Sequence, residues 1–110
     1  MDIYTKADFI ESFWNLQADM FKVAEAHGFH EKDKNPLYVP TALALIGSEV
    51  SEALEAHRKQ EHDKLPNELA DIVIRTMDLA ESLKIDLATE IVNKHEFNKT
   101  RPHKHGNKLY

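Results

Sequence analysis

Apolar residues recur at intervals of three and four positions along most of the chain, which contains only three glycines and four prolines. This spacing is the periodicity of amphipathic helices, and no strand-like alternation lasts long enough to predict a strand. The pattern predicts an all-α chain with four helices, about Thr5 to His27, Thr41 to Lys59, Pro66 to Leu83 and Asp86 to Thr100. Short connections favour antiparallel neighbours, so the expected fold is a four-helix bundle.

Residues with known preferences for helix ends support these boundaries. Thr5, Thr41 and Asp86 are predicted to be N-caps, and Gly28 is predicted to end the first helix. Pro66 fits the first turn of the third helix, where a missing N–H leaves no hydrogen bond unmade. The segment from Gly28 to Pro40 contains two prolines and is predicted to be a loop able to reach over a site.

The 110 residues predict one domain, with a helical part over residues 1–100 and a basic C-terminal tail over residues 101–110. Hydrophobic residues make up 42% and charged residues 30% of the chain, as in folded globular proteins. There is no cysteine, so any metal would be a hard cation held by oxygen ligands, such as Mg²⁺ or Mn²⁺. With no apolar run of membrane-spanning length, we expect a cytoplasmic protein that does not bind a membrane.

Charge is distributed unevenly. Residues 94–110 carry a net charge of +4, so the formal total of −5 leaves −9 on the remainder of the chain. An acidic body argues against nucleic-acid binding, whereas the short basic end could contact a few phosphates. A solvated terminus is the simpler interpretation of the same residues.

Two pairs of acidic residues carry the candidate chemistry. Glu49 and Glu52 on the second helix, and Glu68 and Asp71 on the third, are each three residues apart and so share a helical face. Spacing alone is typical of a solvated surface in a chain with 19 acidic residues. The helical phase is more informative, because Glu49 falls within the apolar arc of its helix and the other three acids border apolar faces.

If the two helices pack antiparallel, the four carboxylates converge. Their repulsion in a poorly solvated place would be costly unless some were protonated or a cation lay between them. Mg²⁺ suits such a set, since it usually keeps waters and substrate phosphates among its ligands. In the alternative interpretation Arg75 or Arg58 neutralises some of the acids.

Two acidic motifs lie on consecutive helices: Glu-x-x-Glu, then fifteen residues from Ala53 to Asn67, then Glu-x-x-Asp. Together they resemble the signature of the all-α MazG-like nucleoside triphosphate pyrophosphohydrolases. The resemblance covers roughly Pro40 to Lys108, although Ser48 stands where that family often carries an acid. It implies a hydrolase that cleaves a (d)NTP to (d)NMP and pyrophosphate in nucleotide-pool house-cleaning. It implies that Glu49, Glu52, Glu68 and Asp71 are metal ligands, or that one of the glutamates instead orients or deprotonates the attacking water. It also implies a homodimer or homotetramer.

The fourth helix offers groups for an anionic substrate. Lys94, Asn98 and Arg101 recur on the face of Leu87 and Ile91, and the run from Asn98 to Lys108 resembles the basic C-terminal end of some MazG-like proteins. Lys and Arg would neutralise phosphate oxygens, and Asn98 could bind sugar or phosphate. The alternative is that these cations merely favour a helix C-terminus.

Recognition of the base is the least defined step. Trp14, with Phe21 or Tyr38 as alternatives, is predicted to stack on a base, although aromatic residues at helical spacing more often belong to a core.

Two rival hypotheses remain. A di-iron carboxylate bundle would use Glu-x-x-His pairs, and no glutamate here has histidine three residues later. A non-catalytic helical interaction module would use the acidic surface only for salt bridges with a partner.

Overall fold

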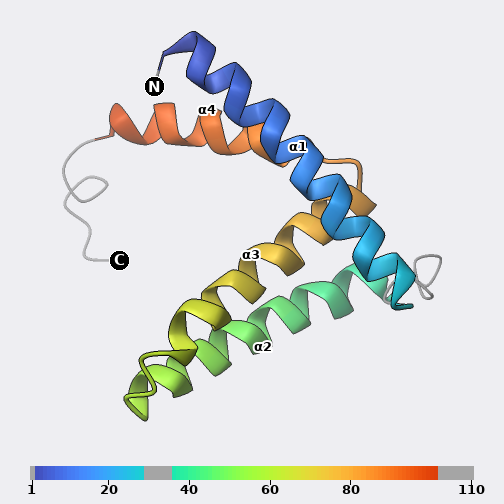
Figure 1. Ribbon diagram of the computed structural model, residues 1–110, viewed down its shortest axis with the longest axis vertical. Coiled ribbons are helices and arrows are strands. Elements are labelled where there is room, and N and C mark those ends of the chain that lie inside the picture. Colours follow the sequence, from blue (N-terminus) through green and yellow to red (C-terminus); the bar gives the residue numbers. More distant parts are fainter. Residues whose placement is uncertain (1, 29–35, 102–110) are drawn as a thin grey trace.

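The computed structural model of the chain describes residues 2–28 and 36–101. Over these residues the chain is helical and has no strand, which confirms the predicted all-α class with four helices (Figure 1). The helices are α1 (Ile3–Ala26), α2 (Tyr38–Arg58), α3 (Lys64–Ser82) and α4 (Leu87–Lys99).

Two of the predicted N-caps are wrong. Asp2 caps α1, because its carboxylate accepts a hydrogen bond of 2.8 Å from the backbone N–H of Thr5. Thr41 lies inside α2, where its N–H donates to the carbonyl of Leu37 at 2.9 Å. Pro40 is tolerated in this first turn because the N–H that it lacks would have no partner within the helix.

Three other predicted boundaries agree with the structure. Asp86 is the N-cap of α4, and Pro66 lies in the first turn of α3. Gly28 follows the end of α1 with φ 80°, a left-handed conformation that glycine adopts without strain. The predicted loop is wrong at its C-terminal end, because Tyr38, Val39 and Pro40 belong to α2. Residues 29–35 of that loop, and residues 102–110 of the predicted tail, lie outside the described residues.

α2 and α3 form an antiparallel pair. The hydroxyl of Tyr38 at the start of α2 lies 2.8 Å from the Ser82 hydroxyl at the end of α3. Ala53 and Ala56 of α2 and Ala80 of α3 are buried. Such small side chains allow the two helix axes to lie close together, so the polar side chains that border the interface are brought within reach of one another.

α1 packs on α3, and a buried polar side chain lies at their contact. Gln17 is buried, and its amide donates to the Glu81 carboxylate at 3.0 Å and to the carbonyl of Ile85 at 3.1 Å. Nearby, the indole N–H of Trp14 donates to Asp86 at 2.7 Å. These bonds fix the middle of α1 against the connection between α3 and α4.

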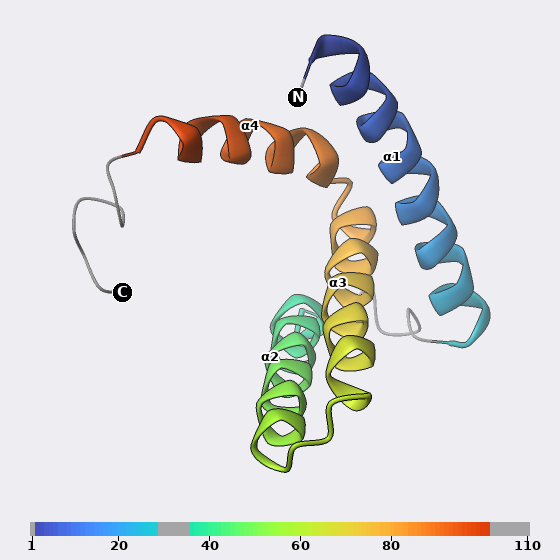
Figure 2. The ribbon, with the colours of Figure 1, turned by 60° about the vertical axis from the view of Figure 1, so that its left-hand side comes forward.

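The chain does not close around one common core. α4 packs against α1 and extends away from the α2–α3 pair (Figures 1 and 2). The radius of gyration is 16.4 Å, compared with about 13 Å for a compact domain of 100 residues. Large apolar side chains on α2 and α3 therefore remain about half exposed, namely Leu43, Val50, Leu54, Leu69 and Val73.

Among the described residues, none of the four helices has the combination of length and apolar character required to cross a bilayer.

Asp86 should contribute to stability as a charged group. Hydrogen bonds from Trp14 and Thr89 lower the pKa of Asp86, so its contribution is present above the ordinary aspartate pKa and is lost as the pH falls through the lowered value. Thermal denaturation at neutral pH should give a melting temperature that falls from wild type to Asp86→Asn and further to Asp86→Ala, because asparagine can still cap α4. Asp8→Asn is the charge-matched control, since exposed Asp8 makes no hydrogen bond or ion pair in the described part of the chain. Equal effects of Asp86→Asn and Asp8→Asn would contradict this role.

Candidate metal centre

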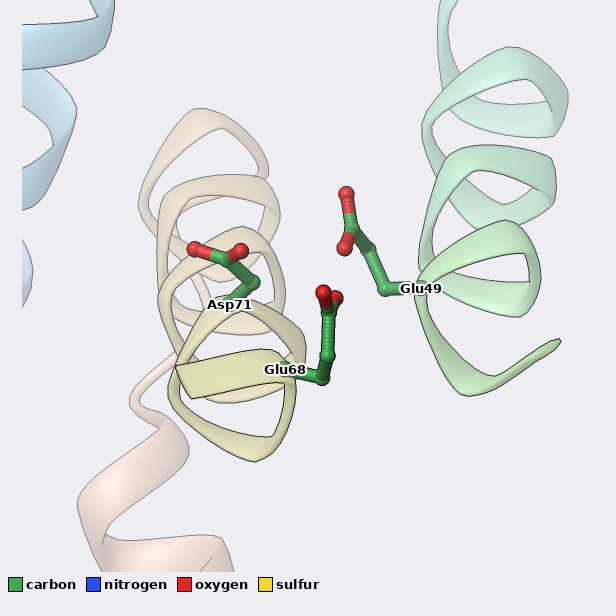
Figure 3. Close-up of side chains that lie close together, drawn as sticks. All are labelled: Glu49, Glu68 and Asp71. Atoms are coloured by element: carbon green, nitrogen blue, oxygen red, sulfur yellow. The ribbon is translucent and has the colours of Figure 1, made fainter. Parts of the chain in front are cut away.

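Three carboxylates meet where α2 lies against α3. One ligand oxygen from each of Glu49, Glu68 and Asp71 lies within 4.8 Å of the other two. Glu49 projects from α2 toward Glu68 and Asp71, which come from consecutive turns of α3 (Figure 3). The antiparallel packing thus brings together the Glu-x-x-Asp pair and the first acid of the Glu-x-x-Glu pair, which are three of the four acids predicted to converge.

Two of the carboxylates have a buried oxygen that no hydrogen-bond donor contacts. Glu49 is only 8% exposed, and its Oε2 atom is buried without a hydrogen-bond partner. Glu68 Oε2 is also buried and unpartnered. A buried charged oxygen without a donor is strongly unfavourable, and oxygens of this kind are the ligands that Mg²⁺ and Mn²⁺ prefer. The donor set therefore fits a divalent cation.

One cation of the protein already reaches the cluster. Arg75 Nε donates to Glu49 Oε1 at 2.8 Å, so the alternative in which Arg75 neutralises an acid holds for Glu49. Arg58 forms no ion pair with any residue that the structure describes. One guanidinium against three carboxylates leaves the cluster with an excess of negative charge.

Glu52 occupies a different position from the other three acids. It is exposed and lies outside the group of converging oxygens. It is nevertheless close to Glu68, because its charge and a hydrogen bond contribute to the titration of that residue. The structure therefore places Glu52 at the solvent side of the cluster.

The surroundings of Glu68 change how readily it ionises. Loss of solvation raises the pKa of Glu68, and the neighbouring charges of Glu52, Glu49 and Asp71 raise this pKa further. These surroundings disfavour the ionised form of Glu68, and a positive charge among the carboxylates would favour it.

Lys94 and Asn98 share a face of α4 and Arg101 lies just after the helix, so these expected phosphate-binding groups do not lie at the cluster. Lys94 and Asn98 line one hollow of about 510 Å³ with Leu87 and Ile91, as predicted. The Lys94 ammonium and the Arg101 guanidinium lie 5.0 and 5.6 Å from the centre of the Phe97 ring. Since α4 packs on α1, this face is separate from the α2–α3 interface within one chain, and Lys108 lies outside the described residues.

Trp14, the predicted base-stacking residue, lies beside Asp86 and is 48% exposed. Its indole N–H donates a hydrogen bond to Asp86, where α1 meets the turn before α4. The structure does not bring it to the carboxylates.

Sequence reasoning missed a cavity between α1 and α3. It measures about 300 Å³, and Met20, Val23 and Ile74 give it an apolar wall. Asp71 and Arg75 also line it, so it adjoins the carboxylate cluster. The available signal was the recurrence of Asp71, Arg75 and Asp78 on one face of α3.

The chain matches no protein-family model, and neither a curated protein nor a solved structure shows significant similarity to it.

The raised pKa of Glu68 predicts that the fold becomes less stable as the pH rises. A carboxyl group whose pKa is raised on folding destabilises the fold when it ionises, so this effect is absent below the ordinary glutamate pKa and complete above the raised value. In the presence of a chelator, the melting temperature should fall as the pH rises through that range, and Glu68→Gln should make the profile flatter. Glu55→Gln, which removes an exposed acid of α2, should leave the wild-type slope in place. The same slope in Glu68→Gln and wild type would contradict the assignment.

Proposed function

We propose that the chain is a Mg²⁺-dependent nucleoside triphosphate pyrophosphohydrolase of the MazG-like kind. The observation that carries this proposal is the convergence of Glu49, Glu68 and Asp71 at a buried point, with two carboxylate oxygens that lack a partner. The order of these acids along the chain resembles the MazG-like signature. The reaction is attack of water on a (d)NTP, with cleavage between the α and β phosphates to give (d)NMP and pyrophosphate. Its role would be house-cleaning of the cytoplasmic nucleotide pool.

The four acids divide into two roles in this proposal. Glu49, Glu68 and Asp71 hold the cation, because their oxygens converge. Bound Mg²⁺, or Mn²⁺ in its place, would polarise the phosphate oxygens and neutralise charge on the triphosphate. Glu52, exposed beside Glu68, is suited to orient or deprotonate the attacking water.

A homo-oligomer would complete the site. The basic face of α4 is separate from the carboxylates of its own chain, and α2 and α3 expose apolar side chains that water solvates poorly. We propose that a second copy covers this apolar surface in a homodimer or homotetramer, so that Lys94 and Asn98 of α4 and Arg101 just after it can bind substrate phosphates. This arrangement accounts for the open shape of the single chain.

The second candidate function is a non-catalytic helical interaction module. The ion pair between Arg75 and Glu49 favours it, because this pair stabilises part of the acidic cluster without a metal. In that case the exposed apolar residues would bind a different protein, and the acids would tolerate amide substitutions.

Glu49→Gln and Asp71→Asn should each abolish Mg²⁺-dependent pyrophosphate release, with a loss of about 100-fold or more, because each removes a charged ligand. The assay would screen nucleoside triphosphates with Mg²⁺ or Mn²⁺ and identify the nucleotide product. Nucleoside monophosphate indicates α–β cleavage, whereas diphosphate indicates cleavage at the terminal phosphate.

Glu55→Gln is the matched control, since it changes an exposed glutamate of α2 that pairs with Lys59. Circular dichroism would establish that each variant retains its helices. Wild-type turnover in Glu49→Gln and Asp71→Asn would rule out catalysis by these groups and favour the interaction module.

Assembly provides a separate test. Light scattering at micromolar concentration should give the mass of a dimer or tetramer for the wild type. Val50→Glu, which adds a charge to the exposed apolar surface of α2, should shift the protein toward monomer, while Ser51→Glu on the adjacent polar position should not. A stable wild-type monomer would contradict the proposed oligomer.

A further inference from the structure

Arg75 lies between the carboxylate cluster and the cavity that adjoins it. It follows Asp71 by one turn on α3, and its Nε donates to Glu49 Oε1 at 2.8 Å. The Arg75 side chain is 34% exposed, compared with 11% for that of Glu49. Arg75 also lines the cavity between α1 and α3. Its charged end therefore contacts a buried acid while the side chain retains access to open space.

The charges at this point are unequal. Glu49, Glu68 and Asp71 supply up to three negative charges, and Arg75 is the residue that forms an ion pair with the cluster. Arginine remains protonated at all relevant pH values, so its charge can be removed from Glu49 only by movement of the side chain. A divalent cation among the same oxygens would be repelled by the guanidinium and would compete with it for Glu49.

The alternative role, in which Arg75 merely orients Glu49, predicts the opposite effect on metal affinity. An orienting partner holds Oε1 so that Oε2 faces the metal, and its removal weakens metal binding. A competing counter-ion weakens metal binding by its presence, so its removal strengthens it. Exposure of Arg75 toward the cavity favours the competing role, because the side chain has space into which it can withdraw.

We propose that Arg75 is a resident counter-ion of Glu49 that a divalent cation displaces toward the cavity. The proposal rests on the metal site of the proposed function. Arg75 stabilises the cluster while no cation is bound, and the cluster consequently binds the cation alone more weakly than its three carboxylates would allow. After displacement, the guanidinium lies in the cavity next to the cation site. An anionic phosphate bound there would form charge-assisted hydrogen bonds with it and so stabilise this position.

The test measures binding of Mn²⁺ alone, by the loss of the electron paramagnetic resonance signal of the free ion. Chelator-treated wild type, Arg75→Gln and Arg58→Gln are titrated at the same pH. Arg75→Gln should bind Mn²⁺ roughly tenfold more tightly than the wild type, since both repulsion and competition are removed. Arg58→Gln removes the same charge from the exposed end of α2 and should change the affinity by less than about twofold.

The outcomes separate this inference from the proposed function. Mn²⁺ binding to the wild type with equal or weaker binding to Arg75→Gln would overturn the counter-ion role and leave the metal site intact. Absence of binding to both proteins at millimolar Mn²⁺ would overturn both proposals. Binding to Arg75→Gln alone would support the counter-ion role in its strongest form.

A measurement on the wild type keeps the inference testable if Arg75→Gln does not fold. The chain has three arginines, so nitrogen-15 spectra resolve few Nε–Hε signals, and those of Arg58 and Arg101 can be assigned from the variants Arg58→Gln and Arg101→Gln. Saturating Mg²⁺ should shift the Arg75 signal and accelerate its hydrogen exchange with water, as the bond to Glu49 breaks. An Arg75 signal unchanged by bound Mg²⁺ would overturn the inference.

Discussion

Repulsion among Glu49, Glu68 and Asp71 is the constraint on which the structure of this site depends. The alanine-rich interface of α2 and α3 brings the three carboxylates to one buried point, and helix packing rather than attraction between the acids holds them there. Among the described residues, Arg75 forms the ion pair with the cluster, through Glu49. Both proposals concern this imbalance, one through a divalent cation and the other through the movement of the arginine.

The open arrangement of the helices also follows from the small side chains between α2 and α3. Alanines allow α2 and α3 to lie close together, but they bury little apolar area, and Met77 is the large side chain that is fully enclosed. α4 contacts α1 and leaves its Lys94 and Asn98 face apart from the acids. A second copy would increase the buried apolar area and supply cations near the carboxylates, so folding, assembly and activity would be linked.

Helical phase could be predicted from sequence because it depends only on local geometry. It identified four helices and placed Glu49 among buried positions, where the structure has it. The N-caps predicted at Thr5 and Thr41 from local propensity were wrong. Asp2 caps α1 instead, and α2 begins at Tyr38 because its first turn can contain Pro40. Three residues correspond to about 300° of rotation around a helix, so Glu52 projects to one side of Glu49 and stays exposed outside the triad. The cavity and the partner of Arg75 depend on how separate helices meet, which periodicity does not specify.

We expect a divalent cation to bind between α2 and α3 at Glu49, Glu68 and Asp71. The most direct measurement is a crystal structure of the protein grown with Mn²⁺, with diffraction data collected at a wavelength where manganese scatters anomalously. We expect one or more anomalous peaks within coordination distance of oxygens from all three residues. Peaks elsewhere, or none beside these carboxylates at saturating Mn²⁺, would contradict it.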